Sequence, residues 1–207
     1  QGKWMKLKMD AMSAVVPEAG KQLLIVQDSV DVLRSSSVRF FEKLSSEGSR
    51  RYSNQSRYRE ANRVADLVRH YDHVRGELEV LREAFTHSVS AVTRLESFLS
   101  EVPEELSEDE VRGSIARIIE QLGELAQALE RITAKQSDDW VYWETGTYVQ
   151  DQLKITLNAV PINVGPNLRR TVFETAESVV ATSATLSIES EFSYFLSRFG
   201  LDSFDEK

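Results

Sequence analysis

Apolar residues alternate at steps of three and four through most of the first 135 residues, a period that restricts this part of the chain to long amphipathic helices. The first run comprises Leu23, Val26, Val30, Leu33, Ser37, Phe40 and Leu44. The second comprises Val64, Leu67, Tyr71, Val74, Leu78, Leu81, Phe85, Ser88, Val92, Leu95 and Leu99. The third comprises Val111, Ile115, Ile118, Leu122, Leu125, Leu129 and Ile132. A repeat of about 3.5 residues keeps one apolar seam of each helix against a neighbour.

Short connectors, around residues 48–55 and 100–107, separate the three runs. Gly48 is a helix stop, and Ser107 with Glu110 forms a capping box ahead of the third run. Because short connectors favour antiparallel neighbours, we expect a long antiparallel helical bundle, with a two-helix arm as the alternative. Residues 5–15 are expected to form a separate helix or lead-in segment that ends before Pro17.

A period of two replaces the helical period near residue 137. Residues 138–146 and 152–164 read as strands, and residues 165–177 read as a short helix with Pro166 near its first turn. Residues 178–181 are apolar without alternation, which is typical of a strand covered on both faces, and a helix that ends at Gly200 follows. The predicted fold is therefore mainly α with a small α/β part, divided into a helical domain over 1–136 and a partial α/β domain over 137–207.

Charge and cysteine content narrow the classes of function. The formal net charge of −8 argues against a protein wrapped uniformly around nucleic acid, but it is compatible with a local basic patch. The absence of cysteine excludes disulfides and thiolate metal sites within this chain. No carboxylate–histidine motif surrounds His70 and His73, so we interpret them as a solvated pair rather than a metal site. No apolar run approaches a membrane span and no signal peptide is visible, so we expect a cytoplasmic protein with no membrane partner.

One segment is locally basic, although the chain as a whole is acidic. Between residues 48 and 65 the only acid is Glu60, whereas the segment holds several arginines and tyrosines. These candidate nucleic-acid-binding residues are Arg50, Arg51, Tyr52, Arg57, Tyr58, Arg59 and Arg63. Arginines hold phosphates and tyrosines stack on unpaired bases, which predicts a contact with single-stranded nucleic acid. The alternative is a loop between helices whose arginines pair with neighbouring acids.

A cluster of small hydroxyl residues follows the apolar run at 178–181. It consists of Thr182, Ser183 and Thr185 around Ala184. Hydroxyls at the carboxyl end of a strand can bond a carboxylate, a metal-bound water or a phosphate oxygen. A turn that caps the next helix is the alternative.

The wider pattern around this cluster resembles motif III of the DinG/XPD family of ATP-dependent DNA helicases. In that family a strand ends in T-S-A-T-L, here residues 182–186, and an aromatic-rich helix that finishes in F-G-L follows, here residues 192–201. The segments VYW at 141–143, AVPINV at 159–164 and LRRTVFETAESVV at 168–180 occur in the family's order. The resemblance covers residues 138–202.

The resemblance implies a role for each part of the chain. Residues 1–136 take the place of the helical Arch insertion, which gates or guides the DNA strand, and residues 137–207 take the place of the motif III end of the first RecA-like motor domain. The parent protein would use ATP and Mg²⁺ to move 5′ to 3′ along single-stranded or forked DNA. Thr182, Ser183, Ala184 and Thr185 would couple ATP hydrolysis to that movement. The implied setting is a bacterial cytoplasmic protein of DNA repair, whose partners are DNA and the remainder of the motor.

The chain alone lacks the parts that such chemistry needs. It holds neither a G-x-x-x-x-G-K-[ST] phosphate loop nor a DEAH box, so we expect the fragment to bind no cofactor and to be inactive by itself. Its lack of cysteine says nothing of an iron–sulfur cluster in the parent. The rival interpretation is a coiled-coil-like protein interaction module without nucleic-acid function. A self-contained hydrolase is disfavoured, because neither a nearby histidine nor a G-x-S-x-G elbow accompanies the hydroxyl cluster.

Overall fold

The chain is mainly helical with a small three-stranded antiparallel sheet, as the sequence predicts. The computed structural model describes residues 2–48, 52, 60–102, 109–134, 136–182 and 192–201. The chain forms two compact units, one made of residues 1–136 with 143–158 and the other of residues 137–142 with 159–207. Helix α4 ends at Thr133, and the hairpin residues 143–158 belong with the helices rather than with the rest of 137–207.

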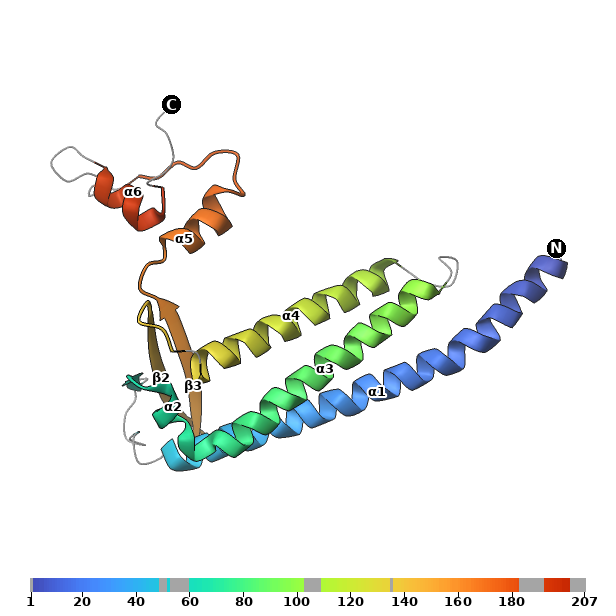
Figure 1. Cartoon of the computed structure of the whole chain (residues 1–207), viewed down its shortest axis with the longest axis horizontal. Helices are drawn as coiled ribbons and strands as arrows, with labels where there is room; N and C mark the ends of the chain where they lie inside the picture. Colours follow the sequence, from blue (N-terminus) through green and yellow to red (C-terminus); the bar gives the residue numbers. More distant parts are fainter. Residues whose placement is uncertain are drawn as a thin grey trace. The chain divides into compact units, whose positions relative to one another are not determined.

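Three long helices lie side by side in the first unit (Figure 1). They are α1 (Gly2–Gly48), α3 (Arg75–Glu101) and α4 (Asp109–Thr133). Helix α3 is central and antiparallel to both neighbours. Its Glu77 and Ser88 contact Lys43 and Ser29 of α1, and its Arg82 and Leu99 contact Glu130 and Arg112 of α4, so the numbering falls on each neighbour as it rises on α3. Arg112 of α4 donates to the carbonyl oxygens of Leu99 and Val102 at 2.8 and 3.0 Å, which caps the end of α3.

Helix α1 is continuous from Gly2 to Gly48, so the prediction of a separate segment ahead of Pro17 is wrong. Proline has no N–H to donate to the carbonyl of Ser13 one turn earlier. Ser13 lies at an exposed position, where the missing bond leaves no buried polar group behind. The stop at Gly48 is as predicted.

The buried row of α1 differs from the predicted seam by one residue at three places, the first of which has Leu23 exposed and Gln22 half-buried. Ser29 and Ser36 are buried, whereas Val30 is exposed and Ser37 is only half-buried. The hydroxyl of Ser88 on α3 donates to the Ser29 carbonyl at 3.1 Å, so small residues of both helices meet at this contact. Serine at these positions lets the helix backbones approach closely, and the core continues through Phe40 and Leu44.

The second predicted seam is buried nearly throughout, with Phe85 and Leu99 half-buried. Its first third is not a single helix, however. It passes through strand β1 (Glu60–Val64), the short helix α2 (Leu67–His70) and the 3₁₀ turn η1 (Asp72–Val74). Asp66 caps α2 by accepting from the Arg69 backbone N–H at 3.0 Å. The predicted capping box at the start of α4 includes Ser107, which lies outside the described residues.

The sheet has the order β1–β2–β3, with β2 (Trp140–Val149) and β3 (Gln152–Pro161) close to the two predicted strands. Gln150 and Asp151 join them with φ values of 50° and 61°, the geometry of a two-residue hairpin turn. Tyr142, Glu144 and Gly146 of β2 are buried, which marks one face of the strand as the inner face. Strand β1 was not predicted.

The second unit holds the short elements at the end of the chain. They are α5 (Gly165–Leu168), the π-helical turn η3 (Arg169–Phe173) and α6 (Ser193–Phe199). Pro166 lies in the first turn of α5 and Gly200 ends α6 with a φ of 72°, both as predicted. The backbones of Gly165 and Gly200 touch so closely that a Cβ on Gly165 would lie 2.8 Å from the Gly200 nitrogen.

The prediction of a buried strand at residues 178–181 is wrong for this structure. The segment is neither helix nor strand, and Val180 is 87% exposed. Val179 and Ala181 line a hollow of about 340 Å³ together with Phe195, Leu196 and other apolar residues. A strand needs a hydrogen-bonding neighbour, and in the described part of the chain no strand pairs with this segment.

Candidate nucleic-acid interface

Tyr52 of the arginine-rich segment is buried against the sheet. Only Tyr52 and Arg63 of its predicted site residues fall within the described part of the chain. Arg50, Arg51, Arg57, Tyr58 and Arg59 lie outside it. Tyr52 is 5% exposed, and its ring lies against Gly146 of β2. The prediction that Tyr52 stacks on a base is therefore wrong, because its ring is already packed against the sheet.

Tyr52 belongs to a buried polar cluster that the sequence analysis did not anticipate. Its hydroxyl donates to Glu144 Oε2 at 3.4 Å, and His70 Nε2 lies 3.0 Å from Glu144 Oε1. The Glu144 side chain is fully buried, so these contacts offset the cost of removing a carboxylate from water. His70 is only 20% exposed, and the prediction of a solvated histidine pair is wrong for it.

Two features of the sequence could have indicated this cluster. Glu144 occupies an inward position of a strand, between Tyr142 and Gly146, where an unpaired carboxylate would be unfavourable. A glycine within a strand also marks close approach by another group, which here is the Tyr52 ring. The partners Tyr52 and His70 are distant in sequence, so the pattern alone could not have named them.

The described basic residues near this cluster are exposed. Arg63 lies on β1 directly after the arginine-rich segment, and Arg69 lies on α2. Arg75 is paired with Asp72 at 2.9 Å. Of the predicted site residues that the structure describes, Tyr52 is thus packed against the sheet and Arg63 is exposed on β1.

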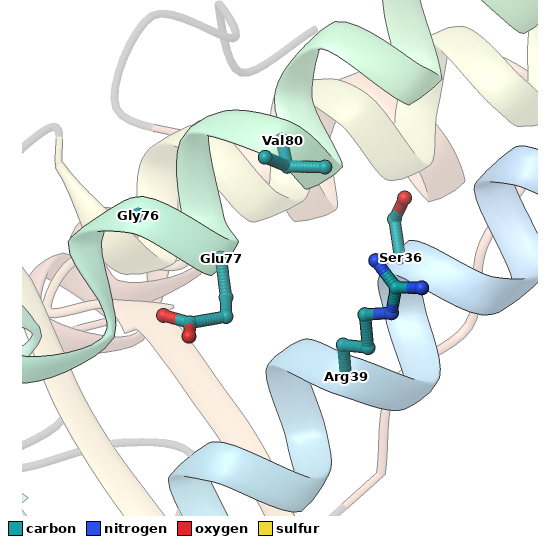
Figure 2. Close-up of a pocket in the computed structure, with 5 residues that line it drawn as sticks. All are labelled: Ser36, Arg39, Gly76, Glu77 and Val80. Atoms are coloured by element: carbon teal, nitrogen blue, oxygen red, sulfur yellow. The ribbon is translucent and has the colours of Figure 1, made fainter.

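A small cavity with charged lining lies between α1 and α3. It has a volume of about 230 Å³, and Figure 2 shows Ser36 and Arg39 from α1 beside Gly76, Glu77 and Val80 from α3. Glu77 Oε1 accepts from Lys43 Nζ at 3.2 Å. The backbone N–H of Glu77 itself, followed by Lys43, lowers the pKa of this carboxyl below its ordinary value. The Lys43–Glu77 contact is an ion pair between α1 and α3.

The predicted coupling motif is described only at its first residue. Thr182 is exposed, and Ser183, Ala184 and Thr185 lie outside the described residues. Arg170 is exposed, and Arg169 pairs with Glu174 at 3.1 Å.

Metal and membrane features were also sought over the described residues. No group of three or more histidine, aspartate or glutamate side chains among them is arranged to hold a metal ion. Within the same residues, no helix combines the length and the apolar character that a bilayer crossing requires.

Comparison with known proteins identifies no family for this chain. No protein-family model matches the chain, and no curated protein matches it either.

Proposed function

We propose that this chain is the Arch-like helical domain and the motif III end of the first motor domain of a DinG-like 5′-to-3′ DNA helicase. The observation that carries the proposal is the ordered set of motifs over residues 138–202, from the aromatic strand through T-S-A-T-L to the helix that finishes in F-G-L. Helix α6 and its stop at Gly200 coincide with the last of these motifs.

The exposed apolar segment at 178–181 supports the same proposal. Ser178, Val179 and Ala181 line an apolar hollow, while Val180 is left exposed. The segment is not a strand here, and we propose that it forms one only where the rest of the motor supplies its hydrogen-bonding neighbours in a RecA-like sheet. We therefore assign the segment to an incomplete sheet.

Within the proposed parent, this chain supplies a guide and a coupling element rather than the reaction centre. It has no phosphate loop and no DEAH box, so ATP and Mg²⁺ would be held by other parts of the protein. The arginines around Tyr52 would hold backbone phosphates of single-stranded DNA. The hydroxyls of Thr182, Ser183 and Thr185 would link the nucleotide state to the grip on that strand.

Single-strand binding at several salt concentrations tests the DNA-guiding part of the proposal. The quadruple change of Arg50, Arg51, Arg57 and Arg59 to alanine should weaken binding of an oligonucleotide and flatten the dependence of log K on log salt. Each lost phosphate contact should reduce the slope by about 0.7. The matched control changes four exposed arginines of the helices, Arg34, Arg94, Arg117 and Arg131, and so alters net charge equally. An equal effect of both quadruple variants would show that only total charge matters and would remove this segment from the interface.

A further inference from the structure

The cavity between α1 and α3 contains two hydrogen-bond donors that the protein itself leaves unused (Figure 2). They are the hydroxyl of Ser36 and the guanidinium of Arg39, both from α1. Among the residues that the structure describes, neither group takes part in a hydrogen bond or an ion pair. The cavity therefore presents an unsatisfied hydroxyl and an unpaired positive charge to a bound molecule.

The environment of Ser36 is the stronger indication of a ligand. Ser36 is 5% exposed, and its hydroxyl points from α1 toward α3 (Figure 2). Its neighbours Ser35 and Ser37 donate their hydroxyls to backbone carbonyls of α1 at 3.0 and 2.8 Å, as serines within helices commonly do. Ser36 makes no such bond within the described part of the chain. Because a buried polar group without a partner is unfavourable, we expect its partner to lie in the cavity.

Arg39 supplies the positive charge of the cavity. It follows Ser36 by three positions, so the two side chains lie on one face of α1, and Figure 2 shows the guanidinium turned toward Ser36. Arg34, on the same helix, is by contrast paired with Asp31 at 3.9 Å. A guanidinium presents several N–H groups in one plane, which suits it to binding the oxygens of an anion.

The carboxylate of Glu77 also lines the cavity but does not cancel this charge. Its Oε1 accepts from Lys43 Nζ at 3.2 Å, and Figure 2 shows the carboxylate turned away from Ser36 and Arg39. The backbone N–H of Glu77, followed by Lys43, lowers the pKa of this carboxyl, so the first turn of α3 already favours negative charge. With Glu77 balanced by Lys43, the charge of Arg39 remains uncompensated.

Gly76 leaves the α3 side of the cavity open. A Cβ at this position would meet nothing within 4 Å. The cavity has a volume of about 230 Å³, which is below the roughly 300–1,000 Å³ that is usual for drug-sized ligands. The space is therefore suited to a small anionic group rather than to a whole cofactor.

We propose that this cavity is an oxyanion site that binds a phosphate group, with Arg39 as the opposite charge and Ser36 as a donor to a phosphate oxygen. A tetrahedral oxyanion presents separate oxygens to the guanidinium and to the hydroxyl, which a halide ion does not. The phosphate is either free in solution or part of a nucleic-acid strand. This proposal does not depend on the helicase assignment, because it rests on α1 and α3 alone.

Titration of the 207-residue chain with inorganic phosphate at constant ionic strength, followed by amide chemical shifts, tests the site. The amides around Ser36 and Gly76 should shift to saturation, with a Kd of about 1–10 mM for so few contacts. Arg39→Gln should weaken binding about tenfold or more, because it removes the charged donor, and Ser36→Ala should weaken it several-fold.

Matched controls make the same changes at neighbouring positions of α1. Arg34→Gln removes an arginine that is paired with Asp31, and Ser35→Ala removes a hydroxyl that is bonded to the helix backbone. Both variants should bind phosphate as the wild type does. Equal weakening by Arg34→Gln and Arg39→Gln would overturn the proposal, and so would the same shifts with chloride in place of phosphate.

Filling the cavity tests its location without a change of charge. Gly76→Leu places an apolar side chain in the open space beside Ser36 and should abolish the phosphate-dependent shifts. Gly113→Leu is the control, because nothing lies within 4 Å of a Cβ at that position of α4 either. Phosphate binding that persists unchanged in Gly76→Leu would contradict the assigned site.

An oligonucleotide distinguishes the two sources of phosphate. If the site takes a backbone phosphate, a single-stranded oligonucleotide should shift the same amides and should bind less tightly to Arg39→Gln. If the site takes free phosphate alone, the oligonucleotide should leave these amides unmoved. Both results retain the site, whereas inorganic phosphate that shifts none of these amides would overturn it.

Discussion

At the scale of single residues, Gly146 determines whether Tyr52 can reach its buried position. A Cβ on Gly146 would lie well inside the van der Waals distance of the Tyr52 ring. The ring could not stay against the strand, and its hydroxyl would leave Glu144, which would then be buried with fewer partners. The packing of Tyr52, and with it the position of this residue of the arginine-rich segment, therefore depends on the absence of a side chain at Gly146.

Gly146→Ala should consequently lower the free energy of unfolding by about 1–3 kcal/mol, the usual cost of forced overpacking. Gly113→Ala is the control, because nothing lies near a Cβ at that position of α4. Alanine there should raise the free energy of unfolding by about 0.5–1 kcal/mol through helix propensity. Urea denaturation measures both, and a neutral Gly146→Ala would contradict the described packing of Tyr52.

Glu77 gives a pH-dependent prediction at the same scale. Its pKa is lowered by its own backbone N–H and then by Lys43, so the fold favours the ionised carboxyl. The stabilisation is fully present above the ordinary pKa of 4.5 and disappears as pH falls through the lower folded value. Glu77→Gln should therefore destabilise the protein at pH 7 and have little effect near pH 2.

Denaturation of Glu77→Gln at the two pH values checks this sign. Glu83→Gln is the control, as Glu83 is exposed on the same helix. A loss of stability in Glu77→Gln that is equally large at both pH values would show that shape rather than charge accounts for the effect.

At the scale of elements, neighbouring phenylalanines of α1 separate the buried row from the exposed face. Phe40 is fully buried and Phe41 is 39% exposed, although their rings pack edge to face with centroids 5.1 Å apart. Phe40→Ala should cost about 3–5 kcal/mol of unfolding free energy, whereas Phe41→Ala should cost far less. Thermal and urea unfolding of the two variants provide the comparison, and similar losses would mean that the buried row of α1 lies elsewhere.

The sequence predicted the helices better than their contacts. Period and connector length are local properties, so the three helices and the β2–β3 hairpin could be located before the structure was known. The buried face of α1 could not, because its contact with α3 depends on the small residues Ser29 and Ser36, which an apolar pattern ignores. Strand β1 lies in a run with helical period, and its pairing with β2 is a long-range contact that overrides the local pattern.

The candidate site was predictable only in part for a related reason. A cluster of arginines and tyrosines is visible as composition, and Arg63 is exposed as such a site requires. Which tyrosine packs inward depends on Gly146 and Glu144, more than 90 positions along the chain. Composition therefore identified the segment, but it gave Tyr52 the wrong role.

At the scale of the whole molecule, the chain exposes apolar residues that we propose are covered in the parent protein. In the second unit the apolar segment at 178–181 leaves Val180 exposed. We propose that this segment pairs with strands from the rest of a motor sheet. The arginine-rich segment, fixed by Tyr52, is the part that we assign to DNA.

The most direct test of the helicase assignment is to compare unwinding with ATP turnover in the full-length protein that carries this chain, as wild type and as Thr185→Ala. The assignment predicts DNA-stimulated ATP hydrolysis and unwinding of a forked duplex in the wild type. In Thr185→Ala it predicts that unwinding falls several-fold more than hydrolysis, because the motif couples the two rather than performing either. Equal losses would remove the coupling role, and a wild-type protein that hydrolyses no ATP on DNA would contradict the assignment itself.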